Sequence, residues 1–355
     1  MERNFQIWNC LPLNPRRDCL MITLQNRLPT TMPERDGFNT MPMIVEDFNA
    51  NDVKTSNVVG LHPQLLTYYL WNAGDGMNVG TNSIQTVAPG KDITYQWYAG
   101  TIDVQPDGKR VATPVEFGST NLMPADGIKQ GSKGAIGTLI VEPKGATWAE
   151  DVGRRAAATV TKADATTFRE FVVVFQNDVN LRHSDGSAVP NTADAEDPED
   201  SAQKAINYRT EPFWARMGFA PDAPLEFTRS LDFTNVLSNA QVGGDPVTPV
   251  FTAKAGTPVR FRVVNPAGHQ RNNVFTVHGH IWQRIPYVNA STAIGSNPLS
   301  EWTSAEMGIG PSSHLDAVLM NGAGGKFAVP GDYLVRTFQS FQFDGGIWGI
   351  LRVTP

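Results

Sequence analysis

The chain carries one ordered series of sequence landmarks twice, and this duplication constrains the fold more than any other feature. Each copy contains a short apolar segment, an alternating run, a histidine-containing segment, a Pro-Gly pair and a glycine-rich closing run. The landmarks occupy residues 11–13, 19–26, 60–63, 88–90 and 133–143 in the first copy, and residues 249–251, 259–265, 277–280, 329–331 and 345–355 in the second. Because the order is shared, a whole domain is duplicated.

The local pattern is that of β-strands. Most segments alternate apolar and polar residues over four to eight positions and end at Pro, Gly, Asn or Asp, as in residues 93–98, 171–175 and 259–263. Helical periodicity is scarce, and short helical turns are expected only near residues 148–154, 202–206 and 212–217. We therefore expect an all-β chain of two tandem β-sandwiches.

The landmarks also predict the domain boundaries. Residues 1–145 form the first domain, the alanine-rich residues 146–165 are a linker, and residues 166–355 form the second domain with a solvated acidic loop at 184–204. The first copy carries about 30 extra residues around 101–130, which we expect to form a hairpin or long loop.

The first domain is expected to lack its N-terminal strand. A strong strand pattern at 168–176 precedes the second copy, whereas only ten residues precede Leu11. A sandwich without an edge strand exposes backbone groups and apolar surface. We therefore expect further N-terminal domains, or another chain, to complete domain one.

Composition excludes several classes of protein. The formal net charge is -6 and the basic residues are scattered, which argues against nucleic-acid binding. No apolar run approaches the roughly 20 residues of a membrane span, and the N-terminus lacks the apolar stretch of a signal peptide. Cys10 and Cys19 flank a predicted hairpin, so a cross-strand disulfide and two half-buried thiols both remain open.

Two segments of the second copy share the residue spacing of a known pair of motifs, which we call the frame. The first is Asn273-Val-Phe-Thr-Val-His278-Gly-His280, and the second runs from Arg336 to Gly346. They resemble the last domain of the multicopper oxidase family, in which H-P-x-H-x-H-G-H precedes H-C-H-x-x-x-H-x-x-x-G. This resemblance implies cupredoxin-like Greek-key β-sandwiches, copper as cofactor, substrate oxidation coupled to dioxygen reduction, and a periplasmic or secreted location.

Most ligand positions of that frame hold other residues. The leading histidines are replaced by Asn273 and Thr276, whereas His278 is retained and His280 follows it. Arg336, Thr337 and Phe338 stand at the H-C-H positions, and Gln342 stands at the later histidine. Since no cysteine occupies the thiolate position, a type 1 copper site within this chain is predicted to be absent.

The first copy keeps even fewer ligands. Its H-x-H segment becomes Gly60-Leu61-His62, and its other motif becomes Pro124-Ala125-Asp126 with Gln130 retained. The resemblance would place His62 opposite His278 across the domain interface, with Asp126 near them. Such a group would hold one metal ion, or would be a buried polar patch left by lost copper.

The full set of metal-ligand candidates is His62, His278, His280, Asp126 and His314. Their neighbours favour a packed role for His280 and a loop-ordering role for His314. The resemblance implies that this chain is the C-terminal part of a multicopper-oxidase-like protein and mainly provides scaffold and interdomain surface. The alternatives are a non-catalytic cupredoxin module that binds or supports a partner, and a mononuclear metal site at His62 and His278. The residues do not decide whether the chain itself is an enzyme.

Overall fold

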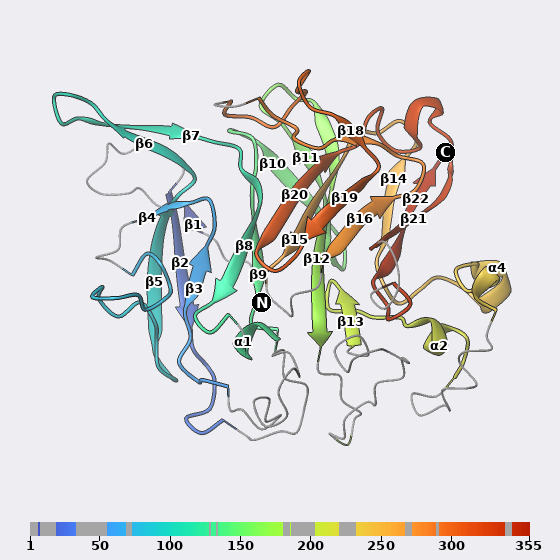
Figure 1. Cartoon of the computed structure of the whole chain (residues 1–355). Coiled ribbons are helices and arrows are strands. Elements are labelled where there is room, and N and C mark those ends of the chain that lie inside the picture. Colours follow the sequence, from blue (N-terminus) through green and yellow to red (C-terminus); the bar gives the residue numbers. More distant parts are fainter. Residues whose placement is uncertain are drawn as a thin grey trace.

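The structure is a computed structural model of two β-rich domains that lie side by side (Figure 1). It describes residues 6–7, 19–32, 55–68, 73–127, 129–132, 134–179, 185, 203–219, 232–266, 272–288, 291–337 and 343–355. Strands account for nearly all regular structure in these ranges, which confirms the prediction of an all-β chain with tandem sandwiches.

Domain one comprises the strands β1 to β9. One sheet has the order β1 (Gln6–Ile7), β2 (Cys19–Gln25), β5 (Asp92–Tyr98) and β4 (Thr67–Tyr68), and the other has the order β3 (Leu61–Pro63), β8 (Gly118–Pro124) and β9 (Gly137–Val141). The short helix α1 (Lys129–Ser132) lies between β8 and β9. Tyr95 and Trp97 stack at 5.6 Å in the core between these sheets, where Ile22, Leu122 and Leu139 are also buried.

The hairpin expected in the extra segment of domain one is present. β6 (Gly100–Val104) and β7 (Arg110–Pro114) pair with each other in a separate two-stranded sheet. This hairpin extends away from the two sandwiches at the upper left of Figure 1.

Domain two comprises the strands β10 to β22. One sheet contains β10 (Thr147–Asp151), β11 (Arg154–Thr161), β12 (Thr167–Val179), β15 (Val259–Asn265) and β20 (Ser313–Val318), with β13 (Gln203–Ile206) beside β12. The other contains β14 (Val250–Lys254), β22 (Trp348–Thr354), β21 (Gly331–Thr337), β16 (Asn273–Val277) and β19 (Ala305–Ile309). β17 (Trp282–Gln283) pairs with β18 (Trp302–Thr303), and the short helices are α2 (Phe213–Arg216), η1 (Phe233–Asn235), α4 (Asn239–Val242) and η2 (Gly325–Phe327).

The pairing of strands repeats between the domains, although one landmark does not match: the Pro-Gly pair at 88–90 precedes β5, whereas the pair at 329–331 precedes β21, which has the pairing of β8. β2 pairs antiparallel with β5, and its counterpart β15 pairs antiparallel with β20. Likewise β8 pairs with β3 and β9, and its counterpart β21 pairs with β16 and β22. The duplication is therefore one of topology as well as of sequence.

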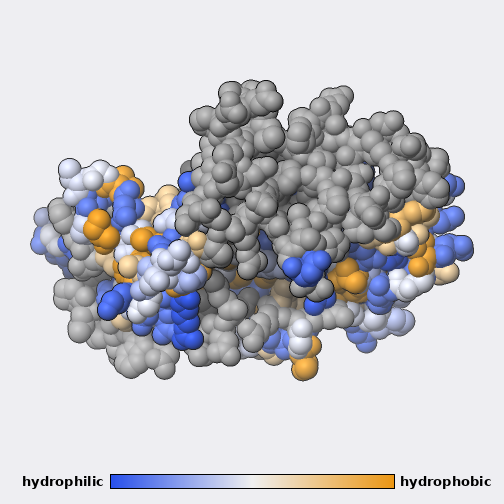
Figure 2. Space-filling view, turned by 90° about the horizontal axis from the view of Figure 1, so that it is seen from below, coloured by the Kyte–Doolittle hydropathy of each residue, from blue (hydrophilic) through white to orange (hydrophobic). Residues whose placement is uncertain are grey.

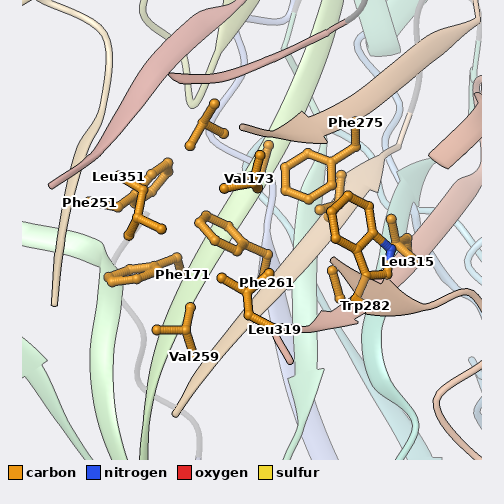
Figure 3. Close-up of a cluster of buried hydrophobic side chains, with 14 of the residues drawn as sticks. Phe171, Val173, Phe251, Val259, Phe261, Phe275, Trp282, Leu315, Leu319 and Leu351 are labelled. Atoms are coloured by element: carbon orange, nitrogen blue, oxygen red, sulfur yellow. The ribbon is translucent and has the colours of Figure 1, made fainter. Parts of the chain in front are cut away.

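The core of domain two is aromatic (Figure 3). Phe171, Phe251, Phe261, Phe275 and Trp282 are fully or almost fully buried, and Phe261 lies 5.3 Å from Phe171 and 5.4 Å from Phe275 between ring centres. These rings come from both sheets, so their packing holds the sandwich together.

Several segments differ from the sequence-based expectation. Residues 146–165, expected to be a linker, contain β10 and β11, which extend the sheet of β12. Their alanines are small enough to pack there, and Ala157, Ala158 and Val160 are buried. Residues 148–154 and 202–206, expected to form helical turns, lie in or between strands, whereas α2 lies where a turn was expected.

Other expectations fall largely outside the described residues. These include the acidic loop at 184–204 apart from Asp185, Lys204 and the start of β13, and the residues between β1 and β2. The prediction that domain one lacks a strand therefore stays a prediction. Cys19 is buried at the start of β2 and is disulfide-bonded, whereas Cys10 lies outside the described residues.

The described surface is of mixed character. Hydrophilic and hydrophobic residues are interspersed over the described part of the face seen in Figure 2. In the described ranges, no helix has the length and apolar character of a membrane span.

Candidate functional site

His278, the best-preserved ligand position, is hydrogen-bonded to an arginine. It follows β16, and its Nε2 accepts a hydrogen bond of 3.0 Å from Arg336 Nε on the neighbouring strand β21. Strand pairing produces this contact, since Arg336 lies opposite Thr276 in the ladder. Burial, and then the positive charge of Arg336, lowers the pKa of His278, so the imidazole is neutral near pH 7.

The hydrogen bond from Arg336 occupies the lone pair of His278 Nε2, the nitrogen that would have to bind a metal ion. An imidazole binds a metal through an unprotonated ring nitrogen, and here the Nε2 lone pair points at a cationic guanidinium. The arrangement therefore does not fit copper at this position.

Two other frame positions are equally unsuited to copper. Asn273 and Thr337 are both fully buried. The Thr337 hydroxyl accepts a hydrogen bond of 3.1 Å from the Val274 backbone, and Asn273 Nδ2 donates to the Ile309 carbonyl at 3.4 Å. An amide and a hydroxyl lack the imidazole and thiolate donors of a blue-copper centre. Phe338 and Gln342 lie outside the described residues.

His280 has a structural role. It is 2% exposed, its Nδ1 lies 2.8 Å from the His278 carbonyl oxygen, and its Nε2 accepts a hydrogen bond of 3.0 Å from the Gly324 backbone. Its ring also meets the edge of Tyr333 at 4.7 Å. Both nitrogens are thus engaged with the protein, in agreement with the packed role expected from its neighbours.

His62 is held by a buried carboxylate. Its Nδ1 lies 2.6 Å from Asp75 Oδ1, and the Tyr68 hydroxyl donates to the same oxygen at 3.3 Å. Asp75 is only 6% exposed. Because a carboxylate accepts, this contact places a proton on Nδ1 of His62.

His62 and His314 line one cavity between the domains. This cavity has a volume of about 420 Å³, and its wall from domain two is Ser312 and His314. A second cavity of about 490 Å³ shares these two residues and extends to Arg284 and Glu306. Burial lowers the pKa of His314, so its imidazole is neutral near pH 7. The cavity thus brings His62 together with His314, while the contacts of His278 are with β21.

Asp126 caps a helix. Its Oδ1 accepts a hydrogen bond of 2.9 Å from the Lys129 backbone at the start of α1, and Gln130 Oε1 accepts one of 3.2 Å from the Asp126 backbone. Gln130 also donates to the Ser56 and Val58 carbonyls. Such reciprocal bonds satisfy the first N–H groups of a helix. The acidic and amide residues of this motif therefore fix α1 and the neighbouring loop.

The five candidate residues are not gathered into one centre. In the part of the chain that the structure describes, no group of three or more His, Cys, Asp or Glu residues is arranged to hold a metal ion. Whether any of the candidates binds a metal stays a prediction.

A dense group of charges lies at the domain interface. Arg262 on β15 is fully buried, and it donates to Glu170 at 3.0 Å, to Asp316 at 2.9 Å and to Glu142 of domain one at 3.1 Å. Arg260 Nη1 lies 2.5 Å from Glu116 Oε1, also of domain one. Two buried arginines and four carboxyl groups thus join the domains.

Sequence reasoning missed this network, although one signal was present. Arg260 and Arg262 alternate with Val259, Phe261 and Val263 within a single strand pattern. Period-two alternation places the two arginines on one face of β15, and such a face is usually solvated. Only the packing of domain one against it shows that it is buried.

Comparisons with known proteins found similarity to solved structures alone. No family model and no curated protein sequence matches the chain. Among solved structures it is similar to a multicopper oxidase, with 18% identity and a TM-score of 0.42 over 84% of this chain and 70% of that one. It is also similar to a blue copper oxidase from Nitrosomonas europaea (15%, TM-score 0.45, 83% and 69% covered) and to a laccase from Botrytis aclada (17%, TM-score 0.48, 95% and 46% covered). At these values the similarity assigns no activity to the chain.

Proposed function

We propose that this chain provides scaffold and interdomain surface in a multicopper-oxidase-like protein. Copper that couples substrate oxidation to dioxygen reduction is bound by other cupredoxin domains, N-terminal to this part or in another chain. The assembly is periplasmic or secreted, like the family that the sequence resembles.

One observation carries this proposal. Arg336 Nε donates to His278 Nε2 at 3.0 Å, so a permanent positive charge lies against the lone pair with which this imidazole would bind a metal ion. A guanidinium does not lose its proton in proteins, and a second cation beside it is repelled. The neighbouring Asn273 and Thr337 supply no thiolate or imidazole.

Copper loading of the purified chain tests the proposal. After incubation with Cu(II) and removal of unbound metal, we expect much less than one copper per chain by elemental analysis, and no blue absorption band. Arg336→His, which returns an imidazole and removes the fixed charge, should raise copper binding, whereas the control Arg336→Lys keeps the charge and should not. A blue wild-type protein with one copper per chain would overturn the proposal.

A second candidate function rests on His62. Histidine ligands in metal sites commonly donate their other nitrogen to a carboxylate, and Asp75 is such a partner for His62. We propose His62 and His314, rather than His62 and His278, as the pair to test for a mononuclear site. Calorimetric titration with Zn(II) or Cu(II) should then show one binding event, lost in both His62→Ala and His314→Ala and weakened in Asp75→Asn. Equal binding by all variants would eliminate this site.

The remaining alternative is a binding or structural module without any redox role. It predicts the same low copper content as the scaffold proposal and differs in the partner. An open reading frame directly upstream that encodes H-x-H and H-C-H motifs would favour the oxidase assembly.

A further inference from the structure

The two domains are joined along β8 and β20. The Ser119 backbone donates to Asp316 Oδ1 at 3.0 Å, the Ser119 hydroxyl donates to the Leu315 carbonyl at 3.1 Å, and Asn121 Nδ2 donates to the Ser313 carbonyl at 3.1 Å. β8 and β9 of domain one lie next to β15 and β20 in Figure 1. Specific hydrogen bonds therefore join the first half of β8 to the first residues of β20.

The approach is too close for a side chain at one position. Gly118 has φ +66°, and a Cβ placed there would lie 2.2 Å from Asp316 Oδ2. Glycine is thus needed at the start of β8 for Asp316 to reach the Ser119 amide. This brings the Asp316 carboxylate and its partner Arg262 directly under domain one.

Among the residues that the structure describes, the charges at this contact do not balance. Glu116, Glu142, Glu170 and Asp316 would carry four negative charges if all were ionised, against the two positive charges of Arg260 and Arg262. Their side chains are between 0% and 12% exposed. Buried carboxylates in excess of their cationic partners are costly, and the usual remedy is to retain a proton.

The surroundings of Glu142, which accepts from Arg262 at 3.1 Å, favour its protonated form. The pKa of Glu142 is raised to about 9, first by burial and then by a hydrogen bond to Glu170, while Arg262 opposes the shift. The groups that face Glu142 are Arg262 on β15, Glu170 on β12 and Glu116 ahead of β8. Two carboxyl groups can share a hydrogen bond only if one of them is protonated.

We propose that the protonation state of Glu142 controls how tightly the two domains dock on each other. In its protonated form it donates to Glu170, accepts from Arg262 and holds domain one against β15 and β20. Loss of this proton leaves a further buried negative charge beside Glu170, and the interface loosens.

The direction of the pH effect follows from linkage. When the domains separate, Glu142 becomes solvated and returns to an ordinary acidic pKa, so docking takes up one proton at neutral pH. The docking equilibrium should therefore weaken by about tenfold per pH unit between the free and the docked pKa of Glu142. Docking is strongest in mildly acidic solution and weakest in alkaline solution.

Hydrogen exchange at the Ser119 amide in the full chain tests the proposal. Glu142→Gln imitates the protonated form, because its amide can donate to Glu170 and its carbonyl can accept from Arg262. The ratio of Ser119 protection in wild type to that in Glu142→Gln should fall by about tenfold per unit between about pH 6 and 8. At the Phe261 amide, inside domain two, the ratio of protection in wild type to that in Glu142→Gln should stay constant with pH. The ratio of Ser119 protection in wild type to that in the exposed control variant Asp103→Asn should also stay constant. A constant ratio at Ser119 would overturn the proposal.

A second measurement does not depend on the variant folding. Infrared spectroscopy of wild type at about pH 8 should show the carbonyl stretch of a protonated carboxyl group, which disappears above the docked pKa of Glu142. The absence of this band in the folded protein would equally overturn the proposal.

Discussion

Among substitutions that remove one charged side chain at the domain interface, Arg262→Met should lower the free energy of unfolding most. The guanidinium is fully buried and makes bonds of 3.0, 2.9 and 3.1 Å to Glu170, Asp316 and Glu142. Methionine fills much of the same volume but leaves all of these carboxyl groups without their cation. Breaking a buried ion pair by removing one partner typically costs about 3–5 kcal/mol. We therefore expect the free energy of unfolding to fall by about 4 kcal/mol.

Arg352→Met is the matched control. Arg352 also binds two carboxylates, Asp245 at 2.7 Å and Asp332 at 2.8 Å, but its side chain is 32% exposed and theirs are 48% and 42% exposed. Solvent-exposed pairs are typically worth about 0–1 kcal/mol. Arg352→Met should therefore cost less than about 1 kcal/mol, although the two arginines make similar numbers of bonds.

Urea denaturation followed by tryptophan fluorescence and circular dichroism measures both losses. The Arg262→Met loss should shrink in mildly acidic solution, because the abandoned carboxylates can then take up protons. Equal losses for the two variants, or a loss below about 1 kcal/mol for Arg262→Met, would refute the reasoning that burial decides the strength of these contacts.

Three other perturbations have defined outcomes. Gly118→Ala should lower the free energy of unfolding by about 2–3 kcal/mol, since its φ is +66° and its Cβ would meet Asp316 at 2.2 Å; an unchanged urea midpoint would contradict this. Phe261→Ala should cost about 3–5 kcal/mol by calorimetry, because the ring is fully buried, and a loss near zero would count against the aromatic core. Burial raises the pKa of Asp344 from 3.8 to about 6, so its contribution to stability should fall as pH rises through that window and then level off. Asp344→Asn should remove that part of the pH profile, and superimposable profiles would show that the shift is absent.

The site was partly predictable from the sequence. That Asn273, Arg336 and Thr337 stand at altered ligand positions stays a prediction from the frame around His278. The neighbours of His280 indicated a packed role, and this histidine is buried. The contact between Arg336 and His278 could not be read in this way, because it depends on how two strands far apart in the chain pair and on the rotamers of both side chains.

His62 illustrates the same limit. Its carboxylate partner Asp75 lies in a separate loop 13 residues later, and no motif connects the two. The family frame suggested His278 as the residue facing His62. His314 lines the same cavity as His62, and β8 contacts β15 and β20 where the domains meet; whether His278 faces His62 stays a prediction.

The sequence by itself determined the class of fold, because strand formation follows from local alternation, spacing and residue type. The tertiary structure alone decided which charges are buried. Arg262 and Glu142 are 120 residues apart, and only the docking of one domain on the other excludes water from them. Desolvation and charge imbalance arise at that step, and the proton that we assign to Glu142 follows from them.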